Sequence, residues 1–274
     1  MNSLRPGGGI PLFDWLDNDH VTRLYLSLGL LMIASFIVFI PAMIFDQRML
    51  DSSPVWVKPQ KFNLSLALHV LTLAVLVQLV PRRVRSGWAL MIFSYLTAFA
   101  VIFEYLYITI QAGRARRSHF NFETQFEALL YAAMGIGAVL LVLVALVLAI
   151  QIWRKGDRSR KGVWLGSIVG LSLGFAITLL FASYMSSTGR FVGAPLEGGG
   201  AVVPVFGWSR EYGDLRPAHF VSLHLMQTVP IAGWLADRKG WNPKLTVLSV
   251  AGVQVALAVF LFVQARAGQP IWPV

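Results

Sequence analysis

The stretch TQFEALLYAAMGIGAVLLVLVALVLAIQIW, residues 124–153, decides the fold class of this chain. No charged residue occurs between Ala128 and Ile150. A helix needs about 20 predominantly apolar residues to cross the hydrocarbon layer of a bilayer. A helix that is apolar on every side is surrounded by lipid or by other helices. The stretch therefore predicts a transmembrane helix.

Further apolar windows of similar length predict an all-α, polytopic integral membrane protein, built as a bundle of about seven transmembrane helices. We place the windows in a single membrane domain, 1–274, near residues 24–45, 62–80, 87–110, 124–153, 163–185, 218–236 and 245–263, with a long loop over 186–216. The window at 218–236 is the least apolar, because it contains two histidines, a glutamine and Pro230.

The composition agrees with a membrane protein. Of the 274 residues, 56% are hydrophobic and 13% are charged, whereas soluble domains contain roughly a quarter charged residues. The net charge of +10 comes from short basic clusters between apolar windows, so we expect membrane lipids as partners and no nucleic acid. Because the chain has no cysteine, disulfides, thiolate metal sites and covalent c-type haem attachment are excluded.

Basic residues in the loops predict the orientation. The even loops, at 82–85, 154–161 and 237–244, are short and contain eleven Lys and Arg residues. The odd loops, which alternate with them, are longer and contain nine. Because short cytoplasmic loops are enriched in Lys and Arg, we expect the N-terminus and the even loops in the cytoplasm. The C-terminus would lie outside, with the protein in the cell (inner) membrane.

Ionisable residues inside the predicted spans are scarce, and such residues tend to mark function. Counted along helices, His69, Glu104 and His224 lie about 12, 10 and 10 Å from the same membrane face. Two imidazoles and a carboxylate are a ligand set favoured by zinc and non-haem iron. We therefore predict a metal site with these three ligands. Nearby side chains would act as catalytic or proton-donating groups: Glu127, His219 and Gln227.

The two histidines of the sixth window are five residues apart, so they diverge by about 140° around a helix. We therefore expect His219 and His224 to contact different neighbours instead of one common ion.

The odd loops carry more basic residues than the predicted orientation explains. Binding an anionic headgroup, a phosphate or a substrate carboxylate would give these residues a role. The predicted substrate-binding residues at this mouth are Lys58, Lys61, Asn63, Arg114, Arg116, Arg117, His119, Asn121, Asp214 and Arg216.

Three functions fit these features. The first, our working hypothesis, is a metal-assisted, membrane-embedded enzyme that acts on a lipid-like or quinone-like substrate. The second is a haem b electron-transfer protein with His69 and His224 as axial ligands. The third is a proton- or ion-coupled transporter, which helices interrupted at mid-membrane would support.

The fifth window carries glycines at helical spacing, Gly166, Gly170 and Gly174. A small-xxx-small pattern lets a neighbouring backbone approach closely. The neighbour is either another helix of the same bundle or a second copy of the chain. A homo-oligomer formed through these glycines is therefore one expectation.

Overall fold

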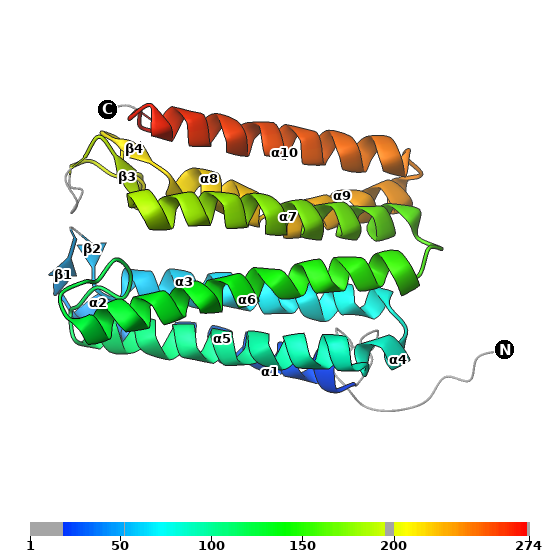
Figure 1. Ribbon diagram of the computed structural model, residues 1–274, viewed down its shortest axis with the longest axis horizontal. Helices are drawn as coiled ribbons and strands as arrows, with labels where there is room; N and C mark the ends of the chain where they lie inside the picture. Colours follow the sequence, from blue (N-terminus) through cyan, green and yellow to red (C-terminus); the bar gives the residue numbers. More distant parts are fainter. Residues whose placement is uncertain (1–18, 52, 195–199, 273–274) are drawn as a thin grey trace.

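The computed structural model describes residues 19–51, 53–194 and 200–272, and Figure 1 shows a bundle of helices. The long helices are α1 (His20–Val38), α3 (Val57–Leu76), α5 (Trp88–Gly113), α6 (Gln125–Lys155), α7 (Lys161–Thr188) and α10 (Pro243–Arg266). The short helical elements are α2 (Ile40–Phe45), the 3₁₀ turn η1 (Val77–Leu79), α4 (Arg82–Arg85), α8 (Arg216–Leu223) and α9 (Leu225–Lys239). Two antiparallel pairs of two-residue strands join β1 (Met49–Leu50) to β2 (Ser53–Pro54) and β3 (Phe191–Val192) to β4 (Gly213–Asp214).

Six of the seven predicted windows form helical segments long and apolar enough to cross a membrane. These segments are His20–Phe45, Val57–Leu79, Trp88–Gly113, Gln125–Lys155, Lys161–Thr188 and Pro243–Arg266. Large apolar side chains point outward from them, including Phe99, Leu129 and Val253. Such outward-facing apolar surfaces indicate that lipid surrounds the bundle. The chain is therefore a multi-pass integral membrane protein.

The sixth window differs from the continuous helix that we predicted, because it is interrupted at His224 between α8 and α9. Pro230 lies inside α9 and has no backbone N–H, which weakens the hydrogen-bond ladder of the preceding turn. The Gln254 amide donates to the Val221 carbonyl over 2.8 Å. The His224 carbonyl accepts from the backbone N–H groups of Gln227 and Thr228 and from the Thr228 hydroxyl, so the interruption is local and part of the backbone bonding continues through it.

The glycine stripe on α7 packs inside the bundle. A Cβ at Gly166 would lie 2.7 Å from the Val229 carbonyl oxygen, and one at Gly170 would lie 2.5 Å from the Leu225 oxygen. Gly174 is likewise covered by the Met226 side chain. The stripe therefore brings α7 and α9 into backbone contact, and these three glycines are not available to a second copy of the chain.

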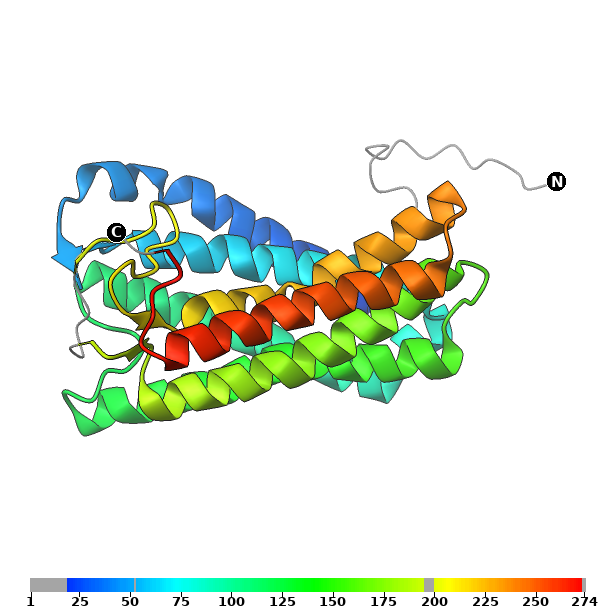
Figure 2. The ribbon, with the colours of Figure 1, turned by 90° about the horizontal axis from the view of Figure 1, so that it is seen from above.

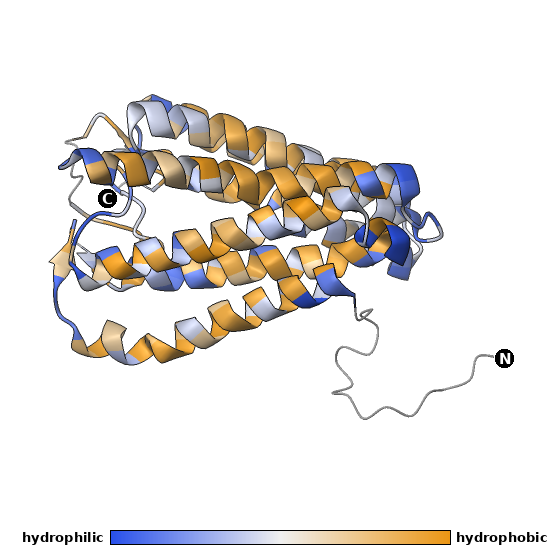
Figure 3. Cartoon of the chain, turned by 60° about the horizontal axis from the view of Figure 1, so that its bottom comes forward, coloured by the Kyte–Doolittle hydropathy of each residue, from blue (hydrophilic) through white to orange (hydrophobic). Residues whose placement is uncertain are grey.

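The bundle has two polar ends with an apolar zone between them, as Figure 3 shows. We call the end with α2 and the four strands the odd-loop end, and the end with α4 and the α6–α7 and α9–α10 connections the even-loop end (Figure 1). Figure 2 shows α10 lying over α7, α8 and α9, and these helices contact one another. Helices α3 and α8 both begin at the odd-loop end, so the predicted site residues on them start from the same face.

Candidate functional site

Glu104 on α5 is buried, with 2% of its surface exposed, against α6. A Cβ at Gly137 of α6 would lie 3.3 Å from its Oε1 atom, so the glycine leaves room for the carboxyl group. Lys58, in the first turn of α3, is the charged residue that acts on it electrostatically. Within the described residues, no side chain or backbone group makes a hydrogen bond to Glu104. A buried carboxylate with one cation nearby is an unusual group at membrane depth.

Lys58 connects this carboxyl group to the odd-loop end. Its Nζ lies 3.1 Å from Nδ1 of His119, which belongs to the loop between α5 and α6. Burial, with the positive charges of Lys58 and Arg190, holds the pKa of His119 well below its usual range. His119 is therefore neutral at pH 7, and its Nδ1 accepts a hydrogen bond from Lys58. The imidazole packs on Phe62 and Tyr131.

Positive charges exceed negative charges around Lys58. Arg117 and Arg190 both bind Asp51, with N–O distances of 2.7 and 3.1 Å. The guanidinium of Arg190 also lies over the Phe191 ring, 4.9 Å from its centroid. The pKa of Arg190 is lowered mainly by burial and secondly by repulsion from Arg216. The cluster is therefore a place where an additional negative charge would be stabilised.

Arg216 and Lys61 complete this cation cluster. Arg216 pairs with the buried Asp214 at 2.6 Å, and its guanidinium lies 5.1 Å from the centroid of the Phe191 ring, which Arg190 also contacts. Lys61 donates to the Phe206 carbonyl at 2.8 Å and makes no ion pair within the described residues. The cluster thus has five cations and three carboxylates, counting Glu104: Lys58, Lys61, Arg117, Arg190, Arg216, Asp51, Asp214 and Glu104.

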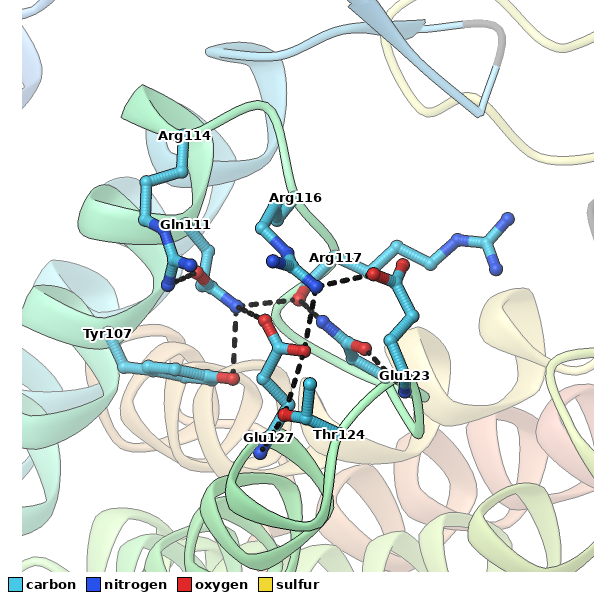
Figure 4. Close-up of polar contacts among 9 residues, drawn as sticks. Tyr107, Gln111, Arg114, Arg116, Arg117, Glu123, Thr124 and Glu127 are labelled. Carbon is cyan, nitrogen blue, oxygen red and sulfur yellow. Dashed lines mark hydrogen bonds and ion pairs between the residues drawn. The ribbon is translucent and has the colours of Figure 1, made fainter.

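Glu127, a predicted catalytic residue, is part of a cap that holds α6 (Figure 4). Its backbone N–H donates to the Thr124 hydroxyl at 3.1 Å, and its carboxylate accepts from Arg116 at 2.9 Å and from Gln111 at 3.4 Å. Arg116 also pairs with Glu123. These bonds hold the start of α6, and the catalytic role of Glu127 stays a prediction.

Several predicted substrate-binding residues belong to the same structural network. Arg114 donates to Gln111 at 3.0 Å, and Asn121 bonds the Arg117 carbonyl at 2.9 Å (Figure 4 shows the surrounding contacts). Asn63 is buried beside Gln60, and its Oδ1 has no hydrogen-bond partner in the described part of the chain. The polar groups of Arg114, Arg116 and Asn121 thus contribute to the loop between α5 and α6, and the substrate-binding roles of these three residues and of Asn63 stay predictions.

The three predicted metal ligands share a depth but face different neighbours. The His69 imidazole lies near the Leu141 backbone on α6, one helical turn from the contact of Glu104 with Gly137, and its buried Nε2 has no hydrogen-bond partner in the described part of the chain. His224 instead lies 3.2 Å from Gln227, through Nδ1 and Oε1. Over the residues 19–51, 53–194 and 200–272, no three His, Asp or Glu side chains form a group that could hold a metal ion. His69, Glu104 and His224 therefore do not form the predicted three-ligand site.

The sixth window contributes a polar connection between helices. Gln227, predicted as a catalytic group, bonds His224 and donates to the Thr72 hydroxyl of α3 at 3.3 Å. His219 points elsewhere, toward the Thr178 backbone on α7. This confirms that His219 and His224 contact different neighbours, as the angle between them predicted.

Sequence reasoning missed two members of the cluster, Asp51 and Arg190. Both lie in loops outside the predicted spans, 139 residues apart, and no motif connects them. The imbalance of charge in the odd loops was the available signal, because unpaired arginines near a low-dielectric interior require carboxylates or anions.

Comparison with protein-family models, with curated proteins and with solved structures gives no match to this chain.

Proposed function

We propose that this protein is a proton-coupled transporter of a small anion, with Glu104 as its proton-binding group. The burial of Glu104 without a hydrogen bond from the described residues is the observation that carries this proposal, together with Lys58, which acts on it electrostatically but makes no direct ion pair with it. An isolated carboxylate in a low-dielectric interior either takes up a proton or keeps a cation nearby. Glu104 and Lys58 therefore form a pair whose attraction depends on one proton.

Lys58 would couple the proton to the anion. When Glu104 is ionised, it attracts Lys58; when Glu104 is protonated, this attraction is lost and the positive charge of Lys58 is available to an anion. The other cations of the cluster raise the affinity of this region for negative charge. Proton binding and anion binding then favour each other, and the favourable coupling is reciprocal.

The interruption between α8 and α9 supports transport over a rigid structural role. Discontinuous helices near the membrane centre are a recurrent feature of secondary transporters. Here the interruption lies at His224, about 10 Å from one membrane face by helix rise. Gln227 connects it to Thr72 on α3. The odd-loop cluster includes residues from the start of α3 and from the start of α8. A change in its charge can therefore alter the position of the interrupted helix α8–α9.

The proposal replaces the metal-assisted enzyme as our working hypothesis, because the described residues contain no group of three metal-ligating side chains. A haem b held by His69 and His224 stays a prediction.

Charge movement in proteoliposomes tests the proton site. On a solid-supported membrane, a step in pH should produce a transient current from the wild-type protein, and Glu104→Gln should abolish it because the amide binds no proton. Glu123→Gln is the matched control, since it removes one carboxylate from an exposed position. A transient of equal size in Glu104→Gln and wild type contradicts the proposal.

The anion is tested with the same preparation. Steps in acetate, succinate or inorganic phosphate concentration at constant pH should produce currents that grow as the pH is lowered, for at least one of these probes. Lys58→Gln should remove this pH dependence. Currents absent for all three probes, or present but independent of pH, contradict proton-coupled anion transport.

A further inference from the structure

The even-loop end contains a pocket of about 430 Å³ between the start of α7 and the end of α9. Its walls are formed by Ser159, Arg160, Trp234, Asp237 and Arg238. The start of α7 and the end of α9 lie at the end of the bundle opposite the odd-loop end (Figure 1), so this pocket is distant from the proposed anion-transport cluster. It therefore requires a separate explanation.

Asp237 carries one negative charge at this pocket, but it makes no ion pair with Arg160 or Arg238 within the described residues, and both of its carboxylate oxygens accept backbone hydrogen bonds. Oδ1 accepts from the backbone N–H of Gly162 at 2.7 Å, and Oδ2 accepts from that of Val163 at 2.8 Å. These bonds cap α7 from a neighbouring helix and satisfy N–H groups that a helix start leaves free. They also fix the two walls of the pocket relative to each other.

The two arginines have no ion pair within the described residues. Arg238 lies with its guanidinium 5.4 Å from the centroid of the Trp234 ring. Arg160 has only the long-range attraction of Asp157, whose carboxylate oxygens accept hydrogen bonds from Ser159. Two guanidinium groups on one pocket offer the planar donor pairs that match phosphate oxygens.

The surroundings point to lipid as the source of the phosphate. Trp234, Trp153 and Trp241 are all partly exposed at this end of the bundle, as expected for a belt at the boundary between lipid and water. Ile231, one turn from Trp234 on α9, is 54% exposed toward the apolar zone. A molecule with its phosphate on the arginines would thus have an apolar surface beside it for acyl chains.

We propose that this pocket binds the headgroup phosphate of an anionic phospholipid, with Arg160 and Arg238 as the phosphate ligands and Trp234 against the glycerol region. Basic pockets between transmembrane helices are a known way of holding anionic headgroups. The proposal does not depend on the transported substrate, since no residue of the odd-loop cluster contributes to it.

Lipid titration of the purified full-length protein in detergent, followed by native mass spectrometry, tests the proposal. Phosphatidylglycerol should bind more tightly than phosphatidylcholine. Arg160→Gln and Arg238→Gln should each weaken phosphatidylglycerol binding about ten-fold, the loss expected for one charge-assisted contact. Both arginines are exposed, so we expect each variant to fold.

Lys244→Gln is the matched control, because Lys244 is an exposed cation at the same end that does not line the pocket. It should leave the affinity within about two-fold, as a charge outside the contact contributes little. An equal loss in all three variants would mean general attraction to a basic surface and would overturn the pocket proposal.

A second arm separates lipid from free phosphate. Inorganic phosphate at the same concentration should neither raise the unfolding temperature of the protein nor displace phosphatidylglycerol. Stabilisation by inorganic phosphate alone, abolished by Arg238→Gln, would assign the pocket to a soluble anion and would overturn the lipid proposal.

Discussion

Both ends of the bundle are basic, but their charges are arranged differently. At the odd-loop end, Arg117 and Arg190 share Asp51, and Arg216 holds the buried Asp214. At the even-loop end, Arg160 and Arg238 lie on an open pocket with no ion pair among the described residues. The number of basic residues in a loop is therefore a poor guide to what the loop binds. The position of the carboxylates decides which cations are held in ion pairs, whereas Lys58 and Lys61 of the odd-loop end make no ion pair within the described residues and can face a ligand.

One buried ion pair of the even-loop end is an exception to this difference between the ends. Its removal is expected to give the largest loss of unfolding free energy. Arg85 lies 3.0 Å from Asp19, and both side chains are at most 3% exposed. Asp19 also caps α1 by accepting from the Thr22 backbone at 3.1 Å. Asp19→Asn should lower the free energy of unfolding by about 3 kcal/mol, because it removes a carboxylate that is paired with the buried Arg85 guanidinium and weakens the cap of α1. Unfolding by a denaturing detergent, followed by tryptophan fluorescence, measures this.

Arg82→Gln is the control for that prediction, since Arg82 is exposed and lies one turn from Arg85. Its effect should stay within about 0.5 kcal/mol. If Asp19→Asn and Arg82→Gln lose similar amounts of unfolding free energy, the buried ion pair contributes no more to stability than an exposed arginine does. The even-loop end would then contain no strongly stabilising ion pair of Arg85.

At the odd-loop end, Asp51→Asn should lower the free energy of unfolding by about 2 kcal/mol. The loss is smaller than for Asp19 because Asp51 and its two arginines are partly exposed, so solvent screens the remaining charges. Added salt should reduce the difference between variant and wild type. Glu123→Gln, at an exposed ion pair of the same end, should change stability by less than about 0.5 kcal/mol. If the Asp51 variant is as stable as wild type, the shared carboxylate does not hold the loops together.

The neutral state of His119 makes the odd-loop end sensitive to mild acid. Its pKa in the folded protein is well below the usual value, mainly through burial and then through Lys58 and Arg190. Below about pH 6.5 the unfolded chain therefore binds a proton that the folded protein does not. Stability should fall as the pH falls from about 6.5 toward the folded pKa, by at most about 1.4 kcal/mol per pH unit. His119→Gln should flatten this part of the pH–stability curve, and an unchanged slope would contradict the assignment.

Helix positions were predictable from the sequence because crossing a bilayer fixes the length of each apolar run. The window at 124–153 corresponds to α6, Gln125–Lys155, within a few residues. Depth was predictable for the same reason, since helix rise is constant. Rotation about the helix axis was not, because apolar residues surround every helix and give no periodic signal. His69 therefore faces Leu141 while His224 faces Gln227, and the predicted metal site does not form.

Contacts between loops that are distant in the sequence could not be predicted either. The short β1–β2 hairpin places Asp51 beside Arg117 and Arg190, 66 and 139 residues away. Pro230 is only a partial signal for the interruption at His224, because proline is also tolerated inside ordinary spanning helices. Its actual position also depends on Gln254 from α10, which bonds the Val221 carbonyl.

The smallest expected effect concerns the unpaired arginines of the even-loop end. In detergent without lipid, Arg160→Gln should change the free energy of unfolding by less than about 0.5 kcal/mol, because no carboxylate in the described chain loses a partner. With phosphatidylglycerol present, wild type should gain more stability than the variant, since a ligand stabilises only the state that binds it. If Arg160→Gln is already destabilised without lipid, Arg160 stabilises the fold itself, as the ion-paired arginines of the odd-loop end do. The proposed difference between the two ends would then be wrong for Arg160.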